Sequence, residues 1–450
     1  MARTLVKSGM IVTMEAGVPD LRQGDVLIDG DRIAAIAPSI EAGGGEIVDA
    51  AGMIVMPGFI NAHIHTWQTA LRGIAADWTI PEYLHNMHAG LAPSFTPKDI
   101  FISNLVGALN QLNAGVTTLV DWCHNNPTPA HTDAAIDGLA EAGIRAVFLH
   151  GSPKPDPKSG QPHFSEIPHP RSEVERLAKA RFAGKNGLLR LGMAVLGPAY
   201  STYAVSRHDL ALARELDMVC SMHVGGGEMR TPDGFPRLVA EGLVGPRVNI
   251  VHGNNLAADQ LAALVDCGAS VTVTPECELQ MGFGDCLTGR LRALGSAPSI
   301  GSDVESSLGG DMFTNMRMAL QAQRNLDNKA VIAKSGKAPE RISIACREAL
   351  EWATIAGARM AGLEQRIGSL APGKQADIVL LRADDLNLTP VIDPVHSIVL
   401  HAGPTNVDTV FVAGRLVKRR GTLLYRDLAR RKSELAAASA ALLARSRILH

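Results

Sequence analysis

Short apolar runs separated by Gly-rich and Asp-rich breaks characterise the first 58 residues. The runs predict strands over residues 4–6, 25–28 and 32–36 of a small sheet. From about residue 58 the pattern changes, and strand-like apolar segments alternate with segments of helical period. This alternation is typical of βα units around a parallel sheet.

Eight strand-like segments can be placed in this second part of the chain. They cover residues 59–63, 117–122, 145–150, 190–196, 218–223, 249–252, 270–274 and 298–303. Helices are predicted between them, for example over residues 97–113, 132–142, 206–216 and 257–267. Eight parallel strands joined by right-handed crossovers predict a closed (β/α)8 barrel.

A helical stretch over residues 342–361 is followed by predicted strands at 377–381, 397–400 and 408–412, and the tail over 424–450 predicts a terminal helix. The fold class is therefore α/β, a (β/α)8 TIM-like barrel with a small β-sandwich domain built from both chain ends. The expected domains are the N-terminal part of the sandwich, the barrel, the C-terminal part of the sandwich and the C-terminal helix. Their ranges are 1–58, 59–365, 366–425 and 426–450.

Composition narrows the choice of function. The chain is 46% hydrophobic and 20% charged with a net charge of −2, so it lacks the basic excess of a nucleic-acid-binding protein. Its apolar runs are too short to span a bilayer, and the N-terminus lacks the apolar core of a signal peptide. We therefore expect a cytoplasmic protein without nucleic-acid or membrane partners.

The six cysteines contain no C-x-x-C pair and do not suggest disulfides, so a bound metal would need His and carboxylate ligands. His63 and His65 form an H-x-H pair whose period of two points both rings to one side of a strand. His223, His252 and Asp303 also lie at the ends of predicted strands. Barrel active sites lie at the carboxyl ends of the strands, so these side chains are expected to converge.

Three imidazoles and a carboxylate would suit zinc or iron(II) and leave room for a water molecule. A divalent ion lowers the pKa of that water to roughly 7, which provides a nucleophile at neutral pH. A neutral His and the Asp carboxylate could then carry protons to the leaving group. The residues thus predict a metal-dependent hydrolase.

Several motifs, in order, make nearly the whole chain resemble the amidohydrolase superfamily. They are Met56-Pro-Gly-Phe-Ile-Asn-Ala-His63-Ile-His65, Leu71-Arg-Gly73, Gly115-Val-Thr-Thr-Leu-Val-Asp121 and Ile367-Gly-Ser-Leu-Ala-Pro-Gly-Lys-Gln-Ala-Asp377. The resemblance is to the branch of cytosine, guanine and S-adenosylhomocysteine deaminases and triazine hydrolases.

The resemblance implies that His63, His65, His223 and Asp303 bind the metal, and that His252 holds or activates the attacking water. Two-metal relatives bridge their ions with a Lys on the fourth strand, but residues 190–196 contain no Lys. One divalent ion per subunit is therefore expected, Zn²⁺ with Fe²⁺ as the alternative. Relatives are often dimers or larger, which implies a homo-oligomer.

One position departs from the family pattern. Deaminases of this branch carry a Glu three residues after the fifth-strand His, where this chain has Gly226. Candidates for the missing proton relay are Glu228, Glu276 and Glu278, although a salt bridge to a loop Arg or Lys would also explain the last two.

Residues at strand ends and in the loop after the first strand are candidates for binding a flat substrate. They are Gln68, Trp78, Trp122, His124 and His150, with Trp67 beside them. His85 and His88 lie one helical turn apart and are interpreted as packing residues rather than a second metal site.

The leading hypothesis is hydrolysis of a C–N bond of a small molecule, with release of ammonia or an amine from an amino-substituted heterocycle. An amide, a carbamate or an aryl chloride is the alternative substrate, because the absence of Glu at position 226 matters less there. A non-catalytic scaffold is the third hypothesis, and metal content would distinguish it.

Overall fold

A computed structural model describes residues 3–41, 43–155, 158–184, 187–225 and 227–446. The chain divides into two compact units, each made of several segments. The first comprises Met1–Asn61, Leu109–Thr118 and Asp311–Arg426, and the second comprises Ala62–Ala108, Leu119–Gly310 and Asp427–His450. These two units do not correspond one to one to the four domains predicted from the sequence, so the predicted domain boundaries remain a prediction.

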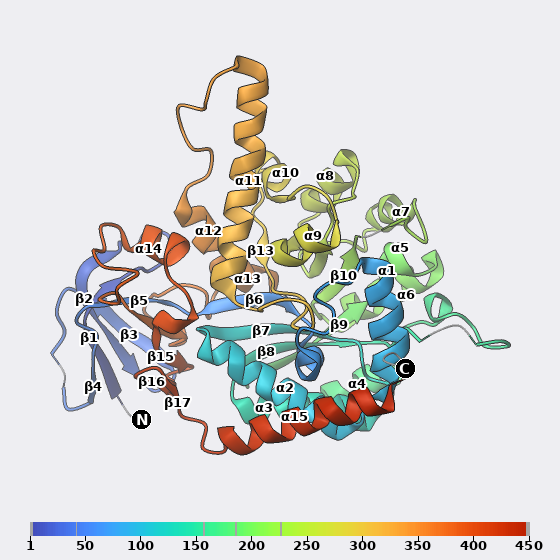
Figure 1. Ribbon diagram of the computed structural model, residues 1–450, viewed down its shortest axis with the longest axis horizontal. Coiled ribbons are helices and arrows are strands. Elements are labelled where there is room, and N and C mark those ends of the chain that lie inside the picture. The colour runs from blue at the N-terminus through green and yellow to red at the C-terminus, as the bar shows by residue number, and fades with distance from the viewer. Residues whose placement is uncertain (1–2, 42, 156–157, 185–186, 226, 447–450) are drawn as a thin grey trace. The chain divides into compact units, whose positions relative to one another are not determined.

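A nine-stranded mixed sheet joins the two ends of the chain. Its strands, labelled in Figure 1, are β1 (Arg3–Ile11), β2 (Leu21–Asp29), β3 (Arg32–Ala37), β4 (Glu46–Asp49), β5 (Met53–Pro57), β14 (Ile378–Arg382), β15 (Val407–Val412), β16 (Arg415–Arg419) and β17 (Thr422–Leu423). Strand β14 pairs antiparallel with β5, so that Ile378 lies opposite Pro57. The prediction that this sheet is built from both chain ends is confirmed.

An eight-stranded parallel sheet forms the barrel, and its strands follow one another in chain order. They are β6 (Phe59–Ile64), β7 (Val116–Cys123), β8 (Arg145–Gly151), β9 (Leu189–Val195), β10 (Cys220–Val224), β11 (Val248–His252), β12 (Ser270–Val273) and β13 (Ser299–Ile300). All eight predicted strands are found, although β13 is only two residues long. The fold class is that of a TIM-like barrel.

Helices connect consecutive barrel strands. They include α2 (Pro97–Asn113), α3 (Pro129–Ala142), α4 (Arg171–Ala180), α5 (Gly197–Tyr200), α6 (Tyr203–Glu215), α7 (Gly234–Ala240), α8 (Ala258–Asp266), α9 (Pro275–Met281) and α10 (Thr288–Ala293). Helix α2 begins at a reciprocal cap in which the Thr96 amide donates to Asp99 at 2.8 Å, and the Asp99 amide donates to the Thr96 hydroxyl at 3.4 Å. Short turns α1 (Ile80–Tyr83), η1 (Thr66–Leu71), η2 (Leu84–Leu91), η3 (Ala92–Ser94) and η4 (Phe164–Glu166) fill the longer connections.

The C-terminal helix α15 (Leu428–Arg445) packs on the outside of α2 and α3, as Figure 1 shows. Arg431 pairs with Glu141 of α3 at 2.7 Å, and Arg445 pairs with Asp99 of α2 at 2.6 Å. Leu442 is fully buried. The predicted terminal helix therefore exists and is held by ion pairs at both ends and an apolar contact.

One prediction for the first unit is wrong, and another is confirmed only in part. Residues 397–400, predicted as a strand, belong to helix α14 (Pro394–Leu400), because the Asp393 carboxylate caps the His396 amide at 3.0 Å and Pro394 favours the first helical turn. The helical stretch over 342–361 is interrupted between α12 (Cys346–Trp352) and α13 (Ile355–Met360). The same unit contains α11 (Met312–Ser335) and η5 (Pro404–Asn406).

No helix of the described residues is both long and apolar enough to cross a bilayer.

The barrel closes between β6 and the segment that follows β13. The amides of Ser302 and Asp303 both donate to the His63 carbonyl at 3.0 Å, and the His65 amide donates to the Asp303 carbonyl at 2.8 Å. Gly301 makes this approach possible, since a Cβ atom there would lie 2.6 Å from both the Cβ and the carbonyl oxygen of His63. Closure therefore requires glycine at this position.

We predict that Gly301→Ala destabilises the protein by about 1–3 kcal/mol, because the added methyl group meets backbone that cannot move without opening the barrel. Thermal unfolding followed by calorimetry measures this. Gly309→Ala is the matched control, because a Cβ at Gly309 meets nothing within 4 Å. Equal melting temperatures for the two variants would contradict the role assigned to Gly301.

Candidate metal centre

Two imidazoles at the end of the first barrel strand form one side of the site. His63 lies in β6 and His65 directly follows it, and their rings meet edge to face with centroids 4.7 Å apart. Both side chains are buried. The period of two along the strand brings them together, as the sequence predicted.

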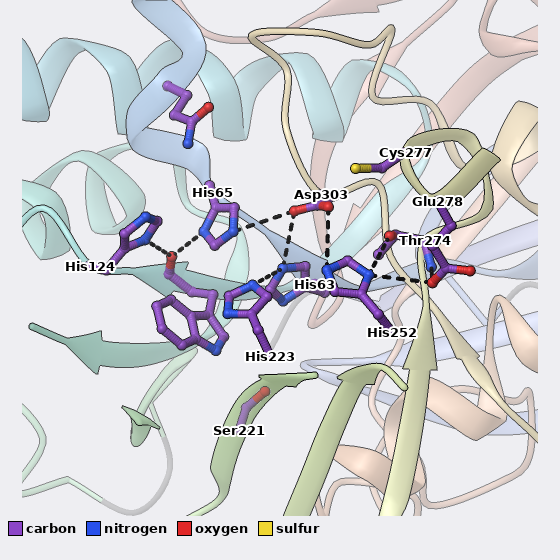
Figure 2. Close-up of polar contacts among 12 residues, drawn as sticks. His63, His65, His124, Ser221, His223, His252, Thr274, Cys277, Glu278 and Asp303 are labelled. Atoms are coloured by element: carbon purple, nitrogen blue, oxygen red, sulfur yellow. Dashed lines mark hydrogen bonds and ion pairs between the residues drawn. The ribbon is translucent and has the colours of Figure 1, made fainter. Parts of the chain in front are cut away.

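Asp303 comes to these imidazoles through the barrel closure. Its Oδ1 lies 3.2 Å from His63 Nε2 and 3.3 Å from His65 Nε2 (Figure 2). The backbone at Asp303 has φ 62°, a left-handed conformation that costs a non-glycine residue about 1 kcal/mol or more. The closure hydrogen bonds hold this strained conformation and so aim the carboxylate.

His223 completes the group from strand β10. Its Nε2 lies 3.1 Å from His63 Nε2, and Figure 2 shows the three imidazoles turned toward Asp303. One ligand atom from each of His63, His65, His223 and Asp303 falls within 4.8 Å of every other. The structure therefore brings together the four residues that the sequence named as metal ligands.

The protonation states in this group are those that metal binding needs. Burial lowers the pKa of His65 to about 3 and holds the pKa of His223 well below its usual range, so both rings are neutral at pH 7. Burial opposes ionisation of Asp303, but the hydrogen bond and charge of His63 outweigh it and lower the pKa of the carboxyl. His65 and His223 are thus neutral and Asp303 is ionised, which are the forms in which these residues bind a metal.

The hydrogen bonding of His65 gives an independent reason for a cation. Its Nδ1 lies 2.7 Å from the Trp122 carbonyl, which can only accept, so the ring proton sits on Nδ1. The Nε2 lone pair then faces Asp303 Oδ1 at 3.3 Å, and two acceptors at this distance repel each other. A divalent cation between them removes this repulsion, so the donor set fits a three-nitrogen, one-oxygen metal site.

His252 lies on the other side of Asp303, at the end of β11. Its Nε2 is 3.8 Å from Asp303 Oδ2, and its Nδ1 is 3.1 Å from the Thr274 hydroxyl and 3.4 Å from Glu278 Oε1. The Phe283 ring stacks on the imidazole with centroids 4.5 Å apart. The backbone of His252 also has a positive φ of 67°. Hydrogen bonds, ring stacking and backbone conformation together fix the position of the His252 imidazole.

Of the three predicted relay residues, Glu278 is the one whose contacts reach the site. It is buried in α9 and accepts hydrogen bonds from the Thr274 amide at 2.8 Å and from Asn254 Nδ2 at 3.3 Å. Its closest basic group is thus His252 rather than a loop Arg or Lys. Glu276 is partly exposed and Glu228 is exposed, and Gly226 lies outside the described residues.

The predicted substrate residues divide into two groups. His124 lines the cavity at the metal centre, and His150 lines an adjoining outer cavity, where its Nδ1 lies 2.9 Å from His169 Nε2. Gln68 is buried, with its amide held by Tyr83 and Ser306 at 2.6 Å each. Trp122 packs against His223 with ring centroids 4.4 Å apart, and Trp78 is partly exposed. The last three do not line either cavity.

Other residues of the inner cavity escaped sequence reasoning. This cavity holds about 40 Å³, enough for a few water molecules, and Tyr83, His88, Tyr200, Cys277 and Phe283 help to line it. His88, interpreted from the sequence as a packing residue, lies beside His124 with 3.1 Å between its Nδ1 and His124 Nε2. Their positions depend on how loops turn back over the barrel, and the strand periodicity carries no signal for this.

Comparison with known proteins places this site among related hydrolases. The model of the amidohydrolase family matches residues 54–231 and 288–417. The chain is 28% identical to a 5-methylthioadenosine/S-adenosylhomocysteine deaminase of Symbiobacterium thermophilum, over 93% of this chain and 94% of that protein. It is 29% identical to an 8-oxoguanine deaminase of Pseudomonas aeruginosa, over 99% and 100%.

Two solved structures share the fold. An adenosine deaminase from Xanthomonas campestris with bound zinc has a TM-score of 0.81 at 22% identity and covers 98% of this chain and 99% of its own. An atrazine chlorohydrolase from Arthrobacter aurescens complexed with zinc has a TM-score of 0.85 at 22% identity, with 97% and 100% covered.

We predict that His223→Asn lowers the affinity for a divalent metal by at least about tenfold, because one of the four donors is lost. Dialysis against a zinc buffer followed by elemental analysis measures the retained metal. His85→Asn is the control, because His85 is exposed and outside the group. Equal zinc retention in the two variants would show that His223 is not a ligand.

Proposed function

Because this chain belongs to the amidohydrolase family, we propose that it removes an amino group from a heterocyclic small molecule by metal-dependent hydrolysis of the C–N bond. The observation that carries the proposal is the buried group of three imidazoles and Asp303, with His252 held beside it. The deaminases among the similar proteins support this reaction rather than another.

His63, His65, His223 and Asp303 would hold one zinc ion per subunit, with Fe²⁺ as the alternative. When bound, a divalent ion here lowers the pKa of a water molecule from about 16 to roughly 7 and so supplies a nucleophile at neutral pH. The zinc named for the two structural relatives supports this choice of metal. Strand β9 contains no Lys that could bridge two ions, which supports a single ion.

Proton transfer falls to Asp303 and His252. Asp303 Oδ2 and His252 Nε2 face each other at 3.8 Å, too far to bond directly, so both can contact the same water molecule. Water adds to the carbon that carries the amino group, one of its protons passes to the ring nitrogen and the other to the leaving group. The C–N bond then breaks, and ammonia leaves while the water oxygen becomes the carbonyl oxygen of the product.

Glu278 would act as a positioning residue behind His252. The carboxylate and the Thr274 hydroxyl both lie next to Nδ1, which favours the tautomer with the proton on Nδ1 and the Nε2 lone pair facing Asp303. The ring can then accept a proton at Nε2, and the resulting positive charge is stabilised by the two carboxylates. This role differs from direct protonation of the substrate.

A second candidate function follows from the acids of the inner cavity. Among the described residues that line it, Asp303 is the only carboxylate, so no second acid is positioned to protonate a ring nitrogen. Hydrolysis of an amide, a carbamate or an aryl chloride needs no such acid.

We also propose a cytoplasmic homo-oligomer, as the family resemblance implies.

Ammonia release from the zinc-loaded protein, measured across aminopurines, pterins, aminopyrimidines and aminotriazines, tests the main proposal. Turnover of at least one class at a rate that depends on added zinc is expected. Silence on the whole panel, together with chloride release from chlorotriazines or cleavage of amides, would establish the second candidate instead.

For a substrate found in this way, Glu278→Gln is expected to lower kcat by about 10- to 100-fold with unchanged zinc content, because His252 loses the carboxyl group that positions it. Glu340→Gln, in an exposed loop, is the control. Glu228→Gln and Glu276→Gln compare the other two candidates directly. A larger loss in either of these than in Glu278→Gln would refute the assignment of Glu278.

A further inference from the structure

A second, larger cavity adjoins the metal centre. It holds about 550 Å³, and it shares His88 and His124 with the inner cavity. This volume is in the range of small-molecule sites, whereas the inner cavity of about 40 Å³ cannot hold a heterocycle with its substituents. A substrate reacting at the metal centre would therefore extend into the outer cavity.

Lys154 lines the outer cavity close to the metal centre, in the segment that follows β8. Its Nζ lies 4.6 Å from the centroid of the Tyr200 ring and 5.7 Å from that of Trp122. Tyr200 lines the inner cavity, and Trp122 packs against His223. Lys154 thus lines the outer cavity and has its ammonium group close to Tyr200 of the inner one.

The charge of Lys154 lacks a carboxylate partner among the described residues, since no ion pair or hydrogen bond involves its Nζ. Other partly buried lysines of this chain have a polar partner: Lys374 pairs with the Glu15 carboxylate at 2.8 Å, and Lys418 donates to the Asn113 carbonyl at 2.7 Å. Burial lowers the pKa of Lys154 to about 8, which still leaves most of it protonated at pH 7.

The other described residues that line the outer cavity carry no negative charge either. None of the described residues that line it is an Asp or a Glu, and Lys158 and His150 are among them. The other lining residues include seven prolines, Phe164, Ile167 and several neutral polar side chains. Aromatic faces attract an ammonium group but leave its hydrogen-bond donors free, so an anion could still bind them.

We propose that the outer cavity binds an acidic group of the substrate, such as a carboxylate, and that Lys154 is its ion-pair partner. The inference rests on the proposed function, because the acidic group would be a substituent of the heterocycle that reacts at the metal centre. Lys154 would then determine specificity: it selects heterocycles that carry a negative charge over neutral ones of the same ring system.

Two matched pairs of probes test this: pterin with pterin-6-carboxylate, and adenosine with adenosine-5′-carboxylate. Their binding to the zinc-loaded protein is measured by titration calorimetry, which needs no turnover. In the wild type, at least one carboxylate should bind more tightly than its neutral partner. Lys154→Met should weaken binding of that carboxylate by about 10- to 100-fold and change binding of the neutral partner by less than about threefold.

Lys154→Arg should restore most of the preference, since it keeps the charge, and Lys154→Gln replaces the Met variant if that protein does not fold. Lys179→Met is the control for a general change of charge, because the Lys179 side chain is 80% exposed. The proposal is overturned if the wild type prefers neither carboxylate, or if the Met and Gln variants keep the preference.

The two proposals fail in different ways. A protein that releases no ammonia from any heterocycle but shows a Lys154-dependent preference for carboxylates loses the proposed deamination and keeps the anion site. A protein that deaminates neutral heterocycles and shows no such preference keeps the reaction and loses the anion site.

Discussion

The backbone hydrogen bonds that close the barrel are the constraint on which the site depends. Through them the His63 carbonyl accepts from two consecutive amides, those of Ser302 and Asp303. The strand that carries the H-x-H pair is thereby held in register with the segment that carries the carboxylate. Because the eight strands are arranged in chain order, these bonds form only when every intermediate strand has taken its place. The metal centre is thus a property of the completed barrel.

Closure also creates unfavourable interactions, and a cation would relieve one of them. The site combines two non-glycine residues with positive φ, His252 and Asp303, and the His65 lone pair facing a carboxylate oxygen. Strained backbone costs about 1–3 kcal/mol at each position, and buried acceptors without a donor are also costly. The surrounding packing maintains this arrangement, which is pre-organised for a ligand that supplies positive charge.

Most of the fold, and the convergence of the four residues expected to bind the metal, could be predicted from the sequence because both depend on the periodicity of strands. A strand of alternating or continuous apolar residues is recognised by itself, and its carboxyl end then marks where a functional side chain will lie. The error at residues 397–400 has a local cause too: four apolar or small residues resemble a strand, and the decisive signal, the Asp393 cap, lies outside them.

The sequence could not predict which side chains around the metal centre are free to meet a substrate. Gln68 lies in the turn after β6 and Trp122 lies near the end of β7, yet Tyr83 and Ser306 bind the Gln68 amide and the Trp122 ring packs against His223. His88 shows the opposite case, since its spacing suggested a packing residue and η2 places it beside His124. These outcomes depend on contacts between segments far apart in the chain, which no local pattern encodes.

Strand ends and the connections between strands thus meet two different requirements of the enzyme: exact placement of the reacting groups and choice of substrate. The ligands and His252 lie at strand ends, where backbone hydrogen bonds fix positions to within a few tenths of an ångström, as proton transfer and metal binding need. Glu278 belongs to the same rigid part, since it is bound to the Thr274 amide where β12 ends and α9 begins. Most residues of the outer cavity lie on connections between strands, although His150 and Gly151 belong to β8. Substitutions on these connections can alter which substrate enters while the strand ends that carry the reacting groups stay in place.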